Sequence, residues 1–491
     1  GSTEQLLGAY YSSFINMDKR NNADYRIVKY HLDLVNSLNS QNIGILDQIV
    51  GELHVRGINV FFGFGVRQDI KNVEQHISSL SQSGLSLPNR DYYLNENKKQ
   101  LLEEFQTYAF EMAQIFGLKE FDAKTLSQDV IDYESRLARA MMSPAEMRIP
   151  EKTYNKMSRQ DVANMMGKFN FESYLKTIGS QPFDSLIVNN PSFIKEFGNG
   201  LIEVDFRVIK NYLTWKIMNH FSGHMNDELV KKRFDFYGVK LSGKTEMKPL
   251  KENAIEEITR SDFGQLLGKK FVEQHFSDDA QKRVNEMVDN LLIVFRERIE
   301  SLDWMSTDTK KEAINKLNSI GRKLGFPEEW EDYSSLHFSD DYLMNFIDVK
   351  RFEHYKNLNK LNEPVNKKQW GMPAHMVNAY YHPLLNEIAF PAGIMQSPFF
   401  DVNAEDAVNY GRIGMVIGHE FTHGFDDMGS KFAADGTFKN WWSENDRKLF
   451  EEKTGILGET FAAFCPIEGH CVNPQRIFDE YMGPCVSSHS G

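Results

Sequence analysis

Cysteine is almost absent from this sequence. The three cysteines, Cys465, Cys471 and Cys485, all lie near the carboxyl end, and the first 464 residues contain none. A disulfide framework therefore does not hold the bulk of the fold together. Because an odd number cannot pair completely within one chain, at least one thiol is free or intermolecular. The spacing includes no CxxC pair, which disfavours a thiolate metal site.

Long apolar runs and a leader segment are also missing. No stretch reaches the length of about 18 apolar residues that a membrane-spanning helix needs, so the sequence predicts no transmembrane segment. The chain opens without a basic, apolar, small-residue signal. Its first residues, Gly1-Ser2, are typical of a cloning remnant, and we expect that a natural targeting segment preceded them.

Positive charge is in deficit. The 56 Lys and Arg residues are outnumbered by 69 Asp and Glu, which gives a net charge of −13. Non-specific binding to nucleic acid requires clustered basic side chains, so the charge balance argues against a nucleic-acid partner. The glycine pair in Phe61-Phe62-Gly63-Phe64-Gly65 lacks the third glycine of a dinucleotide fingerprint. We expect a buried strand or helix end there. Nothing in the sequence indicates an oligomeric state.

What is present indicates a globular protein with at least two units, since 491 residues exceed one ordinary core. Apolar residues at three- and four-residue spacing predict helices over most of the first 340 residues, for example at 98–116 and 278–302. A polar connector at 361–372 marks a change of character. We predict a mostly helical unit at 1–345 and a second unit at 346–491.

The second unit is predicted to contain strands and one long helix. Residues 376–381 and 386–390 alternate or run apolar with aromatic and β-branched side chains, which favours strands. The helix is expected at 403–425, with Asn403 as its N-cap and its end at Gly424.

Within that helix lies the motif that carries chemistry, His419-Glu420-Phe421-Thr422-His423. Residues four apart stand on one helix face, so the two imidazoles can bind one Zn²⁺ while Glu420 reaches an attacking water as a base. Because a chain with 14 histidines can contain HExxH by chance, two partly exposed histidines on an acidic helix are the alternative. The apolar flank 415–418 and the following Asp426-Asp427 pair, which can orient a ligand imidazole, favour zinc.

Several ordered strings then support a family resemblance. They are Leu87-Pro88-Asn89-Arg90-Asp91-Tyr92-Tyr93, Leu302-Asp303-Trp304-Met305, Thr309-Lys310-Lys311, Val377-Asn378-Ala379-Tyr380-Tyr381, residues 387–394, Pro398-Phe399-Phe400, residues 411–420 and His423-Gly424-Phe425-Asp426-Asp427. Together, from about residue 5 to about residue 455, the chain resembles the neprilysin-like zinc metalloendopeptidase family (M13). The lack of early cysteines makes it more similar to the bacterial, PepO-like members.

The resemblance implies a role for each matching residue. His419 and His423 would bind one Zn²⁺ per chain, Glu420 would be the catalytic base, and Asp426 and Asp427 would lie behind the ligands. Asn378 and Ala379 would bind the substrate main chain; a capped turn is the alternative for Asn378. Four residues would line the pocket for the apolar side chain after the scissile bond, and ordinary core packing is their alternative: Ile394, Phe399, Met415 and Val416.

The resemblance also implies an architecture and a setting. The fold would be mainly α and two-lobed, with a thermolysin-like zinc catalytic unit and a small β-sheet facing a large helical unit around an internal chamber. The substrates would be small peptides cleaved on the amino side of apolar residues. The location would be extracytoplasmic, meaning periplasmic, cell-surface or secreted.

The last part of the chain departs from the family pattern. The third zinc ligand of the family is a Glu in a Gly-Glu-Asn-Ile-Ala-Asp string about sixty residues after the second His, and no such string occurs here. Glu480, Asp479 and Glu459 are the candidates by spacing or local likeness. Residues 475–491 match nothing in the family, and the family's later His and Arg are missing. We therefore expect a chain that is truncated at both ends relative to the family pattern.

Two alternatives remain open at this point. The first is a non-catalytic relative, or an inactive fragment, that binds peptide or a partner protein through the same cleft. The second is an intracellular metal-binding or scaffold protein in which HExxH is accidental, which the upstream matches disfavour.

Overall fold

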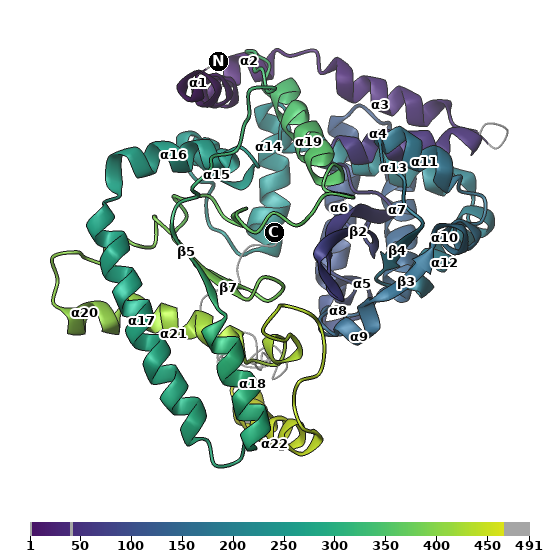
Figure 1. The fold of residues 1–491 in the computed structure, drawn as a ribbon. Coiled ribbons are helices and arrows are strands. Elements are labelled where there is room, and N and C mark those ends of the chain that lie inside the picture. Colours follow the sequence, from purple (N-terminus) through teal and green to yellow (C-terminus); the bar gives the residue numbers. More distant parts are fainter. Residues whose placement is uncertain (1, 40–42, 466–491) are drawn as a thin grey trace. The chain divides into compact units, whose positions relative to one another are not determined.

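The computed structural model describes residues 2–39 and 43–465, and helices dominate it (Figure 1). This confirms a mainly α fold with small sheets. The chain divides into two compact units, and neither is continuous in sequence. Unit 1 comprises the residues up to Arg67, Ile77–Ser261 and Tyr333–Glu363; unit 2 comprises Gln68–His76, Asp262–Asp332 and the residues from Pro364 onward. Among the described helices, none combines the length and apolar character needed to cross a bilayer.

Unit 1 is built mostly of helices. They are α1 (Thr3–Ile15), α2 (Met17–Asn21), α3 (Arg26–Ser37), η1 (Ile43–Ile45), α4 (Leu46–Val55), α5 (Asp91–Leu94), η2 (Glu96–Lys98), α6 (Lys99–Ile115), α7 (Glu120–Ala140), α8 (Pro144–Met147), α9 (Pro150–Thr153), α10 (Arg159–Met166), α11 (Phe171–Ile178), α12 (Pro191–Glu203), α13 (Phe206–Ser222), α14 (Asp227–Arg233), the π-helix η3 (Phe234–Leu241), α15 (Leu250–Arg260) and α19 (Tyr342–Leu358). The predicted helix at 98–116 is confirmed by α6.

A four-stranded sheet lies among the helices of unit 1, although the segment Gln68–His76, which contains the end of β1 and the start of β2, is grouped with unit 2. Its strands, β1 (Phe62–Asp69), β2 (Asn72–Gln82), β3 (Asn155–Ser158) and β4 (Ser185–Val188), lie in the order β1-β2-β4-β3. β2 and β4 run parallel, while β3 is antiparallel to β4. The expectation for Phe61–Gly65 is met by the strand β1. The other three strands were not predicted. β3 and β4 have only four residues each, which carry too little periodicity to stand out from helical sequence.

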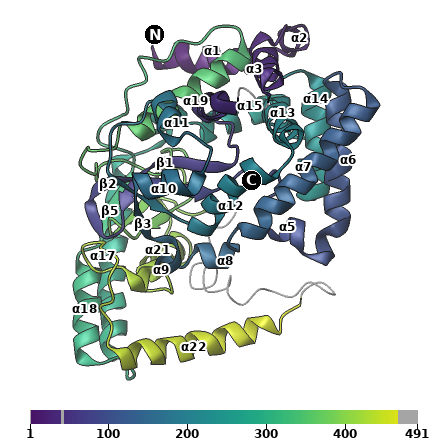
Figure 2. The same ribbon diagram turned by 90° about the vertical axis from the view of Figure 1, so that its right-hand side faces the viewer.

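Unit 2 contains fewer and longer helices. Its elements are α16 (Gly264–His275), α17 (Asp278–Ser301), α18 (Thr307–Asn318), β5 (Gly321–Gly325), β6 (Tyr380–His382), β7 (Glu387–Pro391), α20 (Asp406–Gly411), α21 (Ile413–His423), η4 (Gly429–Lys431) and α22 (Glu444–Ala462). The predicted helix at 278–302 is confirmed by α17. Figure 2 shows α17 and α18 side by side, and α17 also packs on α21.

A three-stranded sheet lies beside these helices in the order β5-β7-β6. β7 occupies the centre, and all five of its residues are buried. β6 pairs with β7 antiparallel through Tyr380↔Ala389, Tyr381↔Ile388 and His382↔Glu387. β6 is therefore an edge strand of this sheet. The predicted strand at 386–390 is confirmed, whereas the one at 376–381 is shorter than expected and begins at Tyr380.

The prediction of one helix at 403–425 is wrong, because two helices share that segment. Asn403 does not cap either of them; its amide donates to Asp401 Oδ1 (2.8 Å), and α20 begins after Glu405. The helix breaks at Arg412, where φ is −105° and ψ is −96°. The Ile413 amide there donates to the Phe399 carbonyl (3.0 Å) instead of continuing the helical ladder.

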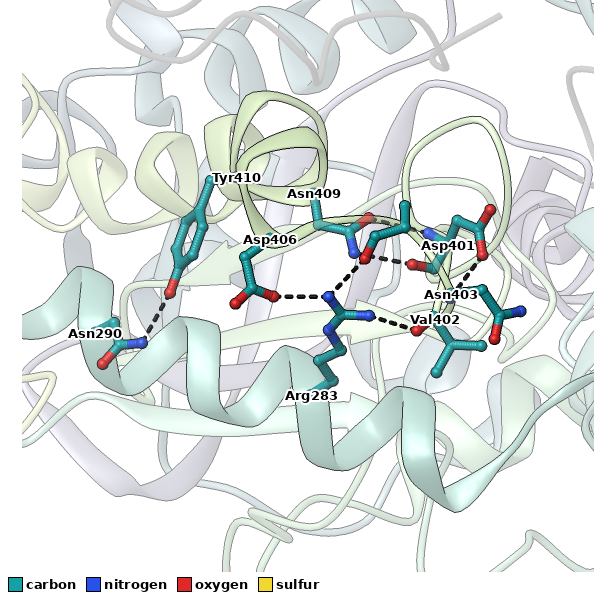
Figure 3. A network of polar contacts seen from close by, with 9 residues as sticks. Arg283, Asn290, Asp401, Val402, Asn403, Asp406, Asn409 and Tyr410 are labelled. Atoms are coloured by element: carbon teal, nitrogen blue, oxygen red, sulfur yellow. Dashed lines mark hydrogen bonds and ion pairs between the residues drawn. The ribbon is translucent and has the colours of Figure 1, made fainter.

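The segment before the break is anchored to α17 (Figure 3). The Arg283 guanidinium donates to the carbonyls of Val402 and Ala404 and pairs with Asp406 (2.6 Å). Two helical turns further along α17, Asn290 donates to the Tyr410 hydroxyl (2.8 Å). These bonds fix the start of α20 from outside the segment, which is information that the local sequence does not contain.

Candidate metal centre

The helix α21 presents both motif histidines on one side. Its apolar side chains, among them Ile413, Val416, Ile417 and Phe421, are part of the buried core of unit 2. Residues four apart share a helix face. The rings of His419 and His423 accordingly lie 4.6 Å apart between centroids and nearly perpendicular to each other. Burying the apolar stripe thus aims the pair of imidazoles at one point.

His419, Glu420 and His423 form the group of potential metal ligands found in the described part of the chain. One ligand atom from each lies within 4.8 Å of the others. His419 is 6% exposed and Glu420 is fully buried. Both ring nitrogens of His419 and both carboxylate oxygens of Glu420 lack a hydrogen-bond partner. Because leaving buried polar atoms unpaired costs about 1–3 kcal/mol each, the site fits a group that supplies the missing contacts, and a metal ion with a polarised water does so.

Burial sets the protonation of the two motif groups. It lowers the pKa of His419 to about 4, helped by His423 and opposed by Asp426. It raises the pKa of Glu420 to about 7, opposed by His423 and by the backbone of Tyr381. Since a metal binds the neutral imidazole, His419 stands ready as a ligand near neutral pH.

Asp426 holds the second histidine from behind. Its Oδ2 lies 2.9 Å from His423 Nδ1, and its Oδ1 accepts hydrogen bonds from the amides of Met428 (3.0 Å) and Gly429 (2.6 Å). A carboxylate at Nδ1 fixes the tautomer, so Nε2 is the ring nitrogen that could bind a metal. Asp427 lies next in the chain, and its carbonyl accepts from the Ser430 hydroxyl (3.4 Å).

The predicted substrate-binding residues lie beside this helix. Asn378 and Ala379 directly precede the edge strand β6, which packs against α21. The Asn378 Oδ1 accepts a hydrogen bond from the amide of the next residue, Ala379 (2.9 Å), a contact within one dipeptide that does not close a turn. Of the predicted pocket residues, Ile394 and Val416 are buried in the core cluster and Phe399 packs against it. Met415 is 58% exposed, on the outer side of α21.

Of the three candidates for a third ligand, Glu459 alone lies within the described residues. Glu459 lies on α22, is exposed, and is not a member of the ligand group. Glu480 and Asp479 lie outside the described residues.

Sequence reasoning missed Lys316, a buried residue near the site. It stands on α18 between Ala313 and Leu317, both buried, and is itself only 1% exposed. The signal was a lysine at the i+3 position of an apolar helix stripe, where the ordinary expectation is a solvated charge.

An HExxH helix, a carboxylate behind its second histidine and an adjoining edge strand define the class of HExxH metallopeptidases. Two sequence models described as "Peptidase family M13" match the chain, one over residues 1–327 and the other over residues 378–487. Because the second match extends to residue 487, the expectation that residues 475–491 match nothing in the family is wrong for most of that segment. The chain belongs to peptidase family M13.

Individual relatives agree with that assignment. The chain is 29% identical to Neprilysin-3 of Drosophila melanogaster over 445 residues, 86% of this chain and 56% of that protein. It is 28% identical to the neutral endopeptidase of Lactobacillus helveticus over 456 residues, 92% of this chain and 70% of that protein. The chain thus spans little more than half the length of the first curated relative.

Solved structures give the same answer. The zinc metalloprotease ZMP1 of Mycobacterium tuberculosis, solved with an inhibitor, superimposes with a TM-score of 0.92 at 30% identity, covering 97% of this chain and 73% of that one. PepO of Lactobacillus rhamnosus has a TM-score of 0.88 at 22% identity, over 97% of this chain and 76% of that one, and shows the shared fold.

Proposed function

We propose that this protein is a zinc-dependent endopeptidase that hydrolyses small peptides on the amino side of apolar residues. The observation that supports it most is the buried, unpaired pair His419 and Glu420 beside His423, whose ring Asp426 orients. Membership of family M13 and the resemblance of the segments around β6 and α21 give further support. By the same resemblance we place its activity outside the cytoplasm.

In this proposal His419 and His423 bind one Zn²⁺. The candidates for a third protein ligand are those that the sequence offers, Glu480, Asp479 and Glu459. Bound zinc supplies Lewis acidity, which polarises a peptide carbonyl and acidifies water. Glu420 is one position along the helix from His419, with its Oε1 3.9 Å from His419 Nε2. In the proposal its carboxylate stands next to the ligands and is not itself one.

Glu420 then acts as the proton shuttle. Its carboxylate accepts a proton from the water that attacks the peptide carbonyl, and returns that proton to the amide nitrogen as the C–N bond breaks. Its buried position one residue along the helix from His419 suits a group that transfers a proton beside the ligands. The net reaction adds one water across one peptide bond.

In the proposal the substrate binds to the segment beside the edge strand β6 and to the predicted apolar pocket residues. An extended peptide would pair with the chain at Asn378 and Ala379 as an added strand, because the sheet ends at β6. Ile394, Phe399, Met415 and Val416 would contact the apolar side chain that follows the scissile bond. Of these, exposed Met415 is the one most accessible to a ligand.

The test is zinc stoichiometry and hydrolysis of internally quenched peptides, measured on chelator-stripped and reconstituted protein. His423→Ala should lose the zinc. Glu420→Gln should keep it but lower hydrolysis by about 10²–10⁴-fold, the usual contribution of a general base. Glu452→Gln is the matched control, since it removes an exposed carboxylate of α22 that is not a candidate ligand. Loss of zinc in Glu459→Gln would identify Glu459 as the third ligand.

Peptide sequence provides the specificity test. A peptide with Leu or Phe after the cleaved bond should be hydrolysed at least about tenfold faster than one with Asp at that position, since a charge would be desolvated without a partner. If the protein binds one zinc but hydrolyses nothing, and Glu420→Gln changes nothing, the chain is a peptide-binding relative and the proposal fails.

A further inference from the structure

The loop that follows α21 is held by side chains that donate hydrogen bonds to its backbone carbonyl groups. Lys316 Nζ donates to the carbonyls of Gly429 and Phe432, both at 2.7 Å. The indole of Trp442 donates to the Ser430 carbonyl (3.0 Å) and that of Trp441 to the Phe432 carbonyl (3.0 Å). Carbonyl oxygens of the turn η4 and its flank are thus satisfied by side chains from outside the turn.

The same loop carries the amides that hold Asp426. Gly429 donates its N–H to Asp426 Oδ1 (2.6 Å) and accepts at its C=O from Lys316. Asp426 in turn meets His423 Nδ1 through its other oxygen (2.9 Å). An unbroken series of polar contacts therefore runs from Lys316 through Gly429 and Asp426 to His423.

Lys316 sits in an enclosed cage. Its ammonium lies 5.9 Å from the ring centroid of Tyr381, 5.7 Å from Phe425 and 5.9 Å from Trp441, all within cation–π range. The backbone carbonyl of Lys316 accepts from Asn386 Nδ2 (3.0 Å). A buried lysine without partners would be expensive, and in this protein two carbonyls and three rings compensate for the lost water.

We propose that Lys316 is a positioning residue of the metal centre: it clamps the loop from Asp426 to Phe432 so that Asp426 holds His423 in its ligand orientation. The inference rests on the proposed function in one respect, that His423 is a zinc ligand. The effect of Lys316 passes to His423 through the Gly429 peptide groups and Asp426.

Packing supports the same mechanism. The loop closes directly onto the end of α21, because a Cβ at Gly429 would come within 1.8 Å of the His423 carbonyl oxygen. A loop this close to the helix end transmits any shift to the His423 backbone as well as to its ring. Burial lowers the pKa of Lys316 to about 7, and Asp426 opposes that decrease.

The first experiment is hydrogen exchange on the metal-free protein, comparing Lys316→Met with Lys311→Met. Both variants remove a lysine from α18, but Lys311 is exposed. Lys316→Met should accelerate exchange of the Met428 and Gly429 amides by at least about tenfold, whereas Lys311→Met should leave them unchanged. Equal exchange in the two variants would overturn the proposal.

The second measurement is zinc affinity, by competition with a chromogenic chelator. Lys316→Met should weaken zinc binding by about tenfold, at the lower end of what loss of an outer partner of a metal ligand costs. In an Asp426→Asn background the link to His423 is already broken, so the added Lys316→Met should cause little further loss. A full tenfold loss in that background would show that Lys316 acts by another route, and would refute the mechanism.

Folding and function can be separated in this design. If Lys316→Met does not fold, Lys316→Gln, which keeps an N–H donor group but removes the charge, should give a smaller acceleration at Gly429. No acceleration there would overturn the proposal. If the unaltered protein binds zinc but cleaves no peptide, the endopeptidase proposal fails while exchange and affinity still decide the role of Lys316. If it binds no zinc, exchange alone decides.

Discussion

At the residue scale, burial sets which protonation state a side chain keeps. His54 of α4 is enclosed in unit 1, with its Nε2 2.9 Å from the Val60 carbonyl and its Nδ1 2.8 Å from the Tyr174 hydroxyl. Because a carbonyl only accepts, Nε2 carries a proton, and in the neutral ring Nδ1 accepts the hydrogen bond from the Tyr174 hydroxyl. Burial lowers the pKa of His54 to about 4, opposed by the Val60 carbonyl.

His54 makes the free energy of unfolding depend on pH. The pKa of His54 is lower in the folded protein than in the unfolded chain. The stability that this residue contributes is therefore fully present above the unfolded pKa of about 6.5. As the pH falls toward 4, up to about 3 kcal/mol of that stability is lost. Urea unfolding at pH 7 and pH 4.5 should therefore show a smaller pH effect in His54→Gln than in the unaltered protein. His337→Gln, at an exposed position, is the control and should retain the full effect. Identical pH effects in all three proteins would contradict the prediction.

The candidate site was predictable at this scale where chemistry follows spacing. The HExxH motif contains His419, Glu420 and His423. Asp426 follows one helical turn later, and in the structure its carboxylate contacts the ring of His423. Lys316 was not predictable, because what makes it special is the pair of carbonyls brought to it from residues 113 and 116 positions away. Helical periodicity describes a face but not what will cover it.

At the element scale, the periodicity of apolar residues predicted the long helices but not the points at which a helix breaks. Apolar spacing continues across residues 403–425, yet the Phe399 carbonyl takes the Ile413 amide and two helices result. In the three-stranded sheet, β7 was predicted and β5 was not, for a similar reason. β7 is a buried apolar run with a strong pattern, whereas β5 is a short segment, Gly321–Gly325, that pairs with β7 in parallel from far away in the chain.

Two glycines near α21 should respond to alanine in opposite directions. A Cβ at Gly418, inside the helix, meets nothing within 4 Å, whereas a Cβ at Gly429 meets the His423 carbonyl oxygen at 1.8 Å. Gly418→Ala should stabilise the protein by about 0.5–1 kcal/mol through reduced backbone freedom. Gly429→Ala should destabilise it by about 2 kcal/mol or more, because the loop has to move. Denaturant unfolding of both variants measures this, and equal shifts would contradict it.

At the scale of the whole molecule, chain order and spatial grouping differ. The predicted boundary between residues 345 and 346 falls inside α19, which spans Tyr342–Leu358 and belongs to unit 1 with Tyr333–Glu363. A pattern read along the sequence finds composition changes, but it does not show that a helix returns to an earlier unit after an excursion of about seventy residues. The division at 345 stays a prediction that fragments can test.

Fragments 1–345 and 1–363 make a matched pair, since both carry the same segment of unit 2. Only the longer one contains all of α19, including the buried residues Phe346, Ile347 and Val349. Because α19 packs on α1 and α4, we expect amides in those two helices to exchange at least about tenfold faster in the shorter fragment. Equal protection in both fragments would support the boundary at 345 and contradict the grouping of α19 with unit 1.

The two indoles that hold the loop after α21 also give the protein an optical reporter. Five of its six tryptophans, all except Trp215, belong to unit 2. Trp441 and Trp442 hydrogen-bond the loop carbonyls, and Trp304 stacks on Trp442 with ring centroids 6.1 Å apart. Intrinsic fluorescence is thus weighted toward the residues next to the HExxH helix, and the arrival of a ligand at that helix can be followed by emission without attaching a dye.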